Sequence, residues 1–306
     1  MGKKAVDILY VLGEGSCWNN NEIRFSLRSV EKNRRNFRKV FIVGSMPKFL
    51  KNVIHIPVQD IYNPAINPDG NIIHKVLQAC KDDRLSNDFL FMNDDYLVLK
   101  PVDASTIPAY HKGDCRNFSE KYFTAGFWRT RLERTYKELR DRGLSTFHYD
   151  GHVPILMNKN WFPEIMKMFD YGKGKGYTMK SLYGNMVYGK GAPIGSVKKV
   201  IFKPYRLEEY DQKFSDCTFA SVNDHGMTPY YKRWVYSKFP DASSFEKDPE
   251  NKSLTALKWF NSDRDIDTGI SIYQQYGPSG NVKKYFQRHR YSLKIQKLEK
   301  HMHKLI

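Results

Sequence analysis

The sequence predicts an α/β fold, with a mostly parallel sheet covered by helices. Short runs of branched and aromatic residues alternate with amphipathic stretches of helical period along residues 6–99. That order is typical of α/β proteins, whose crossover connections are right-handed and keep neighbouring strands parallel. The run over residues 88–99 is apolar on both sides of three polar residues, which indicates a strand buried on both faces.

The first elements follow this alternation. Residues 6–12 form the first expected strand, and a glycine loop follows at 13–16. Glycines permit close approach of the backbone to a ligand, and a glycine turn after a first strand commonly meets phosphate, so Gly13 is a candidate for nucleotide binding. The asparagines at 19–21 can cap a helix over 22–31, whose apolar residues have helical spacing.

Further strands are expected at 39–44 and 53–57, and a helix over 71–79 leads into the run at 88–99. Beyond it, residues 120–142 are basic and partly helical, and a loop at 149–154 precedes a helix near residue 161. A second sheet element is expected at 200–202, and the stretch 219–225 again ends a short apolar run in Asn-Asp.

A cationic glycine loop spans Gly172–Gly176 and carries Lys173 and Lys175. It can hold a phosphate or serve as a flexible linker, and the sequence leaves both readings open. From residue 281 onward, an imperfect apolar stripe lies among many lysines and arginines. We therefore expect a catalytic domain over 1–247 and a basic, mostly helical C-terminal extension over 248–306, suited to a membrane surface, a nucleic acid or the protein's own core.

Asn93, Asp94 and Asp95 follow the buried strand at its carboxyl end, where ligands collect in open α/β sheets. Carboxylates at such a buried position are costly unless something pairs with them, and a hard divalent cation, Mn²⁺ or Mg²⁺, is the simplest partner. The alternative is an ordinary strand-ending turn without metal.

Composition limits the function classes. The formal net charge of +17 favours polyanionic partners, among them glycan, DNA, acidic membrane surface and nucleotide phosphates. The four cysteines show no metal or disulfide spacing, which favours a reducing cytoplasm. Neither a signal stretch nor a run able to span a bilayer is present, so we expect a cytoplasmic protein, for which peripheral membrane contact stays open.

Several stretches, taken together, resemble the Stealth family of sugar-phosphate transferases, which includes capsular-polysaccharide phosphotransferases and the lysosomal-enzyme N-acetylglucosamine-1-phosphotransferase. They occur in the family's order across residues 6 to 247. The matching stretches are Asp7–Tyr10, Asn21–Ser29, Phe91–Asp95, Gly151–Pro154, Ser221–Asp224 and Phe239–Glu246.

The resemblance implies a GT-A-like, Rossmann-like transferase that binds a nucleotide-sugar donor beside a divalent cation. By resemblance, the active site would contain Glu22, Arg28, Asp94, Asp95, His152 and Asp224. We expect Asp94, Asp95 and Asp224 to neutralise the metal, His152 to act as general base, and Glu22 and Asp224 to complete the catalytic set. Donor phosphates would be held by Gly13, Asn93, Arg24 or Arg28, Lys173 and Lys175.

Two departures from the family bear on what is transferred. Val11–Gly15 stands where the family's first motif continues into Trp-Val-Asp-Gly, and lysines, including Lys180, follow His152 where the family has an arginine. These differences leave open whether the sugar or the sugar-1-phosphate moves.

The leading hypothesis is therefore a metal-dependent transferase that uses a nucleotide sugar and a glycan-like acceptor. A glycosyltransferase acting on hydroxylated bases of phage-type DNA is the alternative that the basic charge and compact size suggest. A second alternative is a non-catalytic nucleic-acid-binding protein on a transferase scaffold. The clustered carboxylates argue against it, because without a ligand they are a standing cost.

Overall fold

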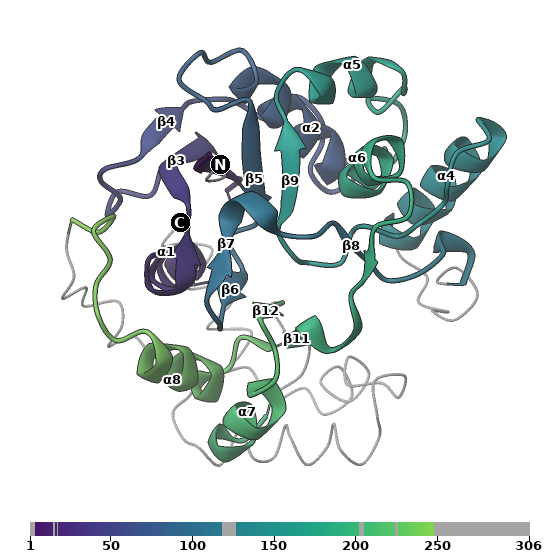
Figure 1. Cartoon of the computed structure of the whole chain (residues 1–306). Helices are drawn as coiled ribbons and strands as arrows, with labels where there is room; N and C mark the ends of the chain where they lie inside the picture. The colour runs from purple at the N-terminus through teal and green to yellow at the C-terminus, as the bar shows by residue number, and fades with distance from the viewer. Residues whose placement is uncertain are drawn as a thin grey trace, which may run out of the picture.

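A computed structural model describes residues 4–14, 16, 18–117, 127–201, 205–223 and 226–247. Its main sheet has five strands in the spatial order β4-β3-β1-β5-β9, of which all but β9 run parallel (Figure 1). The strands are β1 (Val6–Leu12), β3 (Phe37–Gly44), β4 (Ile54–Ile56), β5 (Asp88–Met92) and β9 (Ile155–Asn158).

Helices cover both faces of this sheet, because side chains alternate along each strand and both sets are apolar. In β5, Phe89 and Phe91 pack on the side of α2 (Pro68–Ala79), α5 (Trp161–Lys167) and α6 (Met179–Val187). Leu90 and Met92 pack on the opposite side, with α1 (Asn21–Asn33). A further helix, α4 (Phe127–Asp141), packs on α6 at the right of Figure 1.

A second, smaller sheet has the order β11-β12-β6 and lies below the main sheet in Figure 1. Its strands are β11 (Lys198–Ile201), β12 (Phe219–Val222) and β6 (Tyr96–Val98), with β6 antiparallel to β12. Helices α7 (Leu207–Phe214) and α8 (Pro229–Lys238) pack against it around an aromatic cluster. In that cluster, the rings of Tyr210 and Trp234 stack 5.1 Å apart.

Short pairings complete the described architecture. They join β2 (Arg34–Arg35) to β7 (Val102–Asp103) and β8 (Tyr110–His111) to β10 (Ala192–Pro193), with single 3₁₀ turns at Ala104–Thr106 and Gly195–Val197. The segment between β5 and β6 is the part of the fold that matters for function. The chain leaves the main sheet at Met92 and enters the small sheet at Tyr96, so residues 93–95 join the two sheets.

The structure confirms the predicted fold class and the placement of Asn93–Asp95 after a strand buried on both faces. The asparagine cap of α1 was a wrong prediction. Asn20 is in the left-handed backbone region at φ 58° and makes no side-chain cap hydrogen bond. Its backbone N–H instead donates to Ser16 Oγ at 2.7 Å. The predicted basic extension over 248–306 lies outside the described residues, and the boundary at 247 stays a prediction.

Candidate functional site

The turn at Asn93–Asp95 is half-buried at the carboxyl end of β5, with the backbone N–H of Tyr96 donating to the carbonyl of Asn93 at 3.3 Å. Burial, reinforced by the negative charges of Asp95 and Glu22, raises the pKa of Asp94 to about 7. A raised carboxyl pKa means that the charged form is disfavoured without a cation nearby. The two sheets thus meet at a group of carboxylates that repel one another.

Glu22 reaches this group from the first turn of α1. It is 7% exposed, and Ser16 Oγ donates to its Oε2 at 2.7 Å. Because the same Ser16 oxygen accepts the N–H groups of Trp18 and Asn20, one side chain fixes both the start of the helix and the orientation of this carboxylate. The structure thereby brings Glu22, Asp94 and Asp95 together from two distant parts of the chain.

His152 approaches from the other side of the turn. Its Nδ1 lies 3.9 Å from Asp95 Oδ2, and its ring centre lies 6.3 Å from that of Tyr96. The side chains of His152 and Asp95 are 40% and 19% exposed, so both are accessible to a substrate. His152 has a backbone φ of 52°, a region that residues other than glycine seldom adopt and that is often found at functional sites.

A group of buried lysines adjoins His152. Lys180 Nζ donates to Tyr96 Oη at 2.8 Å and lies 3.6 Å from Asp150 Oδ1. Burial lowers the pKa of Lys180 and, with the nearby charges of Lys112 and Lys180, lowers that of Lys198 to about 6. Burial opposes ionisation of Asp150, yet Lys180 and the neighbouring basic groups lower its pKa. The site therefore has an acidic side at Asp94 and a basic side at Lys180.

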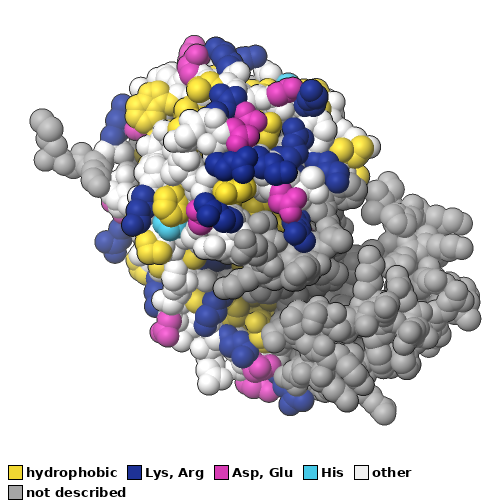
Figure 2. Space-filling model, turned by 90° about the vertical axis from the view of Figure 1, so that its right-hand side faces the viewer, with side chains coloured by type: hydrophobic (Ala, Val, Ile, Leu, Met, Phe, Trp, Pro, Cys, Tyr) yellow, Lys and Arg dark blue, Asp and Glu magenta, His cyan; other side chains and the backbone are white. Residues whose placement is uncertain are grey.

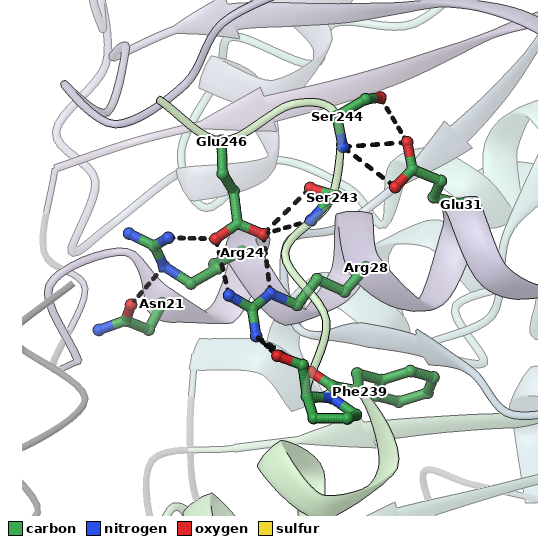
Figure 3. A network of polar contacts seen from close by, with 9 residues as sticks. Asn21, Arg24, Arg28, Glu31, Phe239, Ser243, Ser244 and Glu246 are labelled. Carbon is green, nitrogen blue, oxygen red and sulfur yellow. Dashed lines mark hydrogen bonds and ion pairs between the residues drawn. The ribbon is translucent and has the colours of Figure 1, made fainter. Parts of the chain in front are cut away.

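Arg24 and Arg28, predicted to offset phosphate charge, lie in a different environment. Both side chains are buried and pair with the carboxylate of Glu246, Arg28 Nε at 2.7 Å (Figure 3). Arg24 also donates from Nε to Asn21 Oδ1, and Arg28 from Nη1 to the carbonyl of Phe239, at 2.9 and 3.0 Å. Burial and this pairing hold both guanidinium groups inside the fold, where they tie the segment 239–246 to α1.

The remaining predicted phosphate-binding residues include Gly13 and the Gly172–Gly176 loop. Gly13 is exposed after β1, and a methyl group added there would meet open space. The Gly172–Gly176 loop lies beside α4, where the carbonyl of Lys173 accepts from Arg134 Nη1 at 2.7 Å. Lys175 Nζ lies 3.5 Å from Thr130 Oγ1 on the same helix. Each of these assignments stays a prediction.

Asp224, predicted as a metal ligand and catalytic residue, lies outside the described residues. Among the residues that the structure describes, no group of three or more His, Cys, Asp and Glu side chains is arranged to hold a metal ion. A cavity of about 490 Å³ lies at the carboxyl end of β4, lined by Ile56, His74 and Lys81 among others, and none of the predicted site residues lines it. The carboxylate group, not this cavity, defines the candidate site, because chemistry needs its reactive side chains to converge.

The surface that carries α4 is basic but mixed in sign. Figure 2 shows Lys and Arg side chains gathered across the face that carries α4, with Asp and Glu among them. On α4, Arg129 pairs with Glu133 at 2.9 Å, and Arg142 with Glu138 at 2.7 Å. Such exposed ion pairs contribute little to stability. A polyanionic partner for this protein therefore stays a prediction from its net charge.

Sequence reasoning missed Asp150 and Lys198, and it noted Lys180 only as a departure from the family. Asp150 directly precedes the Gly-His-x-Pro stretch, and that stretch was the sequence signal that could have marked it as a site residue. Lys198 opens a strand of four residues and is one of many lysines in the chain, which gave no signal. Only the folded chain shows that it is buried.

No family model and no curated protein matches this chain. Solved structures of glycosyltransferases show weak structural similarity. The bifunctional glycosyltransferase WbbM (apo) is 8% identical, with a TM-score of 0.46 over 85% of this chain and 52% of its own, so the chain spans about half its length. The galactosyltransferase LgtC, in complex with donor and acceptor sugar analogs, is 10% identical, with a TM-score of 0.42 over 79% of this chain and 98% of its own.

Mouse xyloside xylosyltransferase 1, in its apo form, is 9% identical, with a TM-score of 0.39 over 73% of this chain and 98% of its own. At these identities and TM-scores, the similarity does not by itself assign an activity. Separately, none of the helices within the described ranges has the length and apolar content needed to cross a bilayer.

Proposed function

We propose that this protein is a metal-dependent transferase that uses a nucleotide sugar as donor and a glycan-like molecule as acceptor. The observation that carries the proposal is the convergence of Glu22, Asp94, Asp95 and His152 at the junction of the two sheets. Acidic groups at the carboxyl end of a buried strand, opposite a basic side, suit a cation and the phosphates that it neutralises.

The charge of the carboxylates supports a divalent cation in this proposal. Asp94 has a raised pKa because it is buried beside Asp95 and Glu22, and a bound cation would remove this cost. Asp94 and Asp95 are the residues that would hold it, with Asp224 as the predicted third ligand. When bound, Mn²⁺ or Mg²⁺ would neutralise the charge of the donor's phosphates and of the leaving group.

The side chains around the turn have separable roles in the proposal. His152 takes the proton from the acceptor hydroxyl, with Asp95 beside it to stabilise the protonated ring. The acceptor oxygen then forms a bond either to the anomeric carbon, releasing the nucleoside diphosphate, or to the sugar-bearing phosphorus, releasing the nucleoside monophosphate. Lys180, on the opposite side, pairs with Asp150 and does not contact the substrate in this scheme.

The resemblance to Stealth transferases supports the second of these bonds, in which the sugar moves with its phosphate. The experiment incubates the protein with Mn²⁺ or Mg²⁺, a panel of nucleotide sugars and glycan acceptors, and identifies the released nucleotide. Release of nucleoside monophosphate together with a phosphodiester product indicates sugar-1-phosphate transfer, and release of the diphosphate indicates sugar transfer. Absence of turnover with every donor, under conditions in which the protein is folded, contradicts the proposal.

A divalent cation is expected to stabilise the free protein more at pH 8 than at pH 6. With the pKa of Asp94 near 7, a proton competes with the cation below that pH and is lost above it. We expect the cation to raise the thermal midpoint by a few degrees at pH 8, about the effect of 1 kcal/mol. Thermal unfolding with and without Mg²⁺ at both pH values measures this, with Ca²⁺ as a second hard cation. A shift that is equal at both pH values would argue against Asp94 as a ligand.

The DNA-modifying alternative rested on net charge, compact size and the basic C-terminal segment. No contact within the described part of the chain favours DNA over a glycan as acceptor. Hydroxymethylated DNA belongs in the acceptor panel, where steep weakening of binding with added salt would mark it as a partner.

A further inference from the structure

Residues 150–153 form the loop that carries His152, and two buried lysines hold its backbone. Lys198 Nζ donates to the carbonyl of Gly151 at 2.5 Å, and Lys180 Nζ donates to the carbonyl of Val153 at 3.2 Å. The two carbonyls flank His152 in the sequence. The lysines come from different elements, β11 of the small sheet and the first turn of α6 on the main sheet.

The loop needs such restraint. His152 has a φ of 52°, which costs free energy for a residue with a side chain and persists only where the surroundings impose it. Gly151 and Val153 are both buried, whereas the side chain of His152 is 40% exposed. The backbone is thus fixed on each side of one residue whose ring is presented toward Asp95.

The two lysines on the basic side of the site are almost fully buried. Lys198 is 7% exposed, and Lys180 has a side chain that is 3% exposed. Burying an ammonium group is costly unless it is paired or hydrogen-bonded. A methionine would fill either position at lower cost, so these lysines call for a role beyond packing.

We propose that Lys198 and Lys180 are positioning residues, which hold the backbone of residues 150–153 so that the His152 ring faces Asp95. This inference rests on the proposed function for its catalytic consequence, but the positioning itself is a property of the free protein. Lys180 adds a second restraint, because it also donates to Tyr96 Oη, next to the Asn93–Asp95 turn. The lysine thereby links the turn that carries the acids to the loop that carries the histidine.

The neighbouring Lys199 provides a matched control. It too donates from Nζ to a backbone carbonyl at 2.5 Å, that of Lys213, but it is exposed and points to the other face of β11. Lys198→Met and Lys199→Met therefore make the same substitution and remove the same kind of hydrogen bond, one residue apart. Only the first should affect His152.

The test has two readouts. The first is the ring resonance of His152 in the free protein at fixed pH, assigned by its disappearance in His152→Gln. We expect Lys198→Met to shift and broaden it and Lys199→Met to leave it in place. The second is steady-state kinetics, in which Lys198→Met should lower kcat by about 10- to 100-fold with donor KM within about two-fold, because a displacement of about 1 Å has effects of that size.

The outcomes separate the two proposals. A displaced His152 signal in a protein whose wild-type form turns over no nucleotide sugar leaves the positioning intact and contradicts the transferase. An unmoved His152 signal in folded Lys198→Met, or an equal displacement in Lys199→Met, overturns the positioning whatever the kinetics show. If Lys198→Met does not fold, Lys180→Met releases the Val153 carbonyl instead, and the same displacement of the His152 signal is expected.

Discussion

Replacing Asp94 with asparagine is expected to stabilise the free protein while lowering transferase activity by about 100- to 1,000-fold, the effect of several kcal/mol of lost charge stabilisation. Asparagine keeps the shape of the side chain but removes the charge that burial, Asp95 and Glu22 disfavour. The substitution removes a metal ligand that the proposed function needs. It also removes a charge repulsion that destabilises the free protein.

The stability part of this prediction depends on pH. The pKa of Asp94 is about 7 in the folded protein, above its ordinary value of 3.8, so the folded state binds this proton more tightly. Wild-type stability should therefore fall as pH rises from about 4 to 7, whereas Asp94→Asn lacks this loss. Because solvent screens part of this cost at the half-buried turn, we expect the variant to be more stable by about 1–2 kcal/mol at pH 8 and equal to wild type near pH 4.

Denaturant unfolding at pH 4, 6 and 8, together with the donor assay, measures both parts. The exposed Asp83 gives the control, since Asp83→Asn removes a carboxylate on the loop before β5 without touching the turn. Asp94→Asn with full activity would remove Asp94 from the site. A destabilised variant at pH 8 would show instead that its carboxylate is favourably paired in the folded protein.

Replacing Glu246 with glutamine is expected to destabilise the protein by about 3–5 kcal/mol, the usual cost of removing one partner from a buried ion pair. Its carboxylate receives Arg24 and Arg28, and also the backbone N–H and hydroxyl of Ser243 at 2.9 and 3.1 Å (Figure 3). Glutamine would leave two buried guanidinium groups without a neutralising charge. Urea or guanidinium unfolding at neutral pH measures the loss.

The same structure supplies the control in Glu31, which accepts from the backbone N–H of Ser244 at 3.0 Å but is exposed. Glu31→Gln should cost less than about 1 kcal/mol, since exposed pairs contribute little. Although burial opposes its charge, the pairing with Arg28, the backbone of Ser243 and Arg24 lowers the pKa of Glu246. Its contribution should therefore be present above about pH 4.5 and be lost as pH falls below that value. Equal effects of the two substitutions would contradict the structural role assigned to Glu246.

Much of the main sheet could be predicted from the sequence, because its signals are local. The runs at 6–12, 39–44 and 88–92 are apolar over the length of a strand, and burial on both faces requires that pattern. The helices α7 and α8 were missed. A sheet element was predicted at 200–202, but not the three-stranded sheet on which the aromatic residues of these helices pack. The strand β9 was missed as well, because its four residues follow directly on the predicted loop at 149–154. Its antiparallel pairing with β5 depends on the connection and not on the strand itself.

The candidate site was predicted in part. Asp94, Asp95, Glu22 and His152 do converge, although the role of each stays a proposal. Arg24 and Arg28 show why charge alone misleads: an arginine on a helix reads the same in sequence whether it faces a phosphate or a buried carboxylate. Their partner Glu246 is more than 200 residues away, with separations of 222 and 218.

The sequence by itself determined where the chain ends its buried strand and which acidic residues follow it, because strand burial and turn chemistry depend on neighbouring residues. Only the tertiary structure decided which distant groups surround that turn. Glu22, His152, Lys180 and Lys198 meet there because α1, α6 and the small sheet pack around one junction. The charge balance of a site depends on that packing, since burial and distance set the pKa of each group and neither can be read from its residue type.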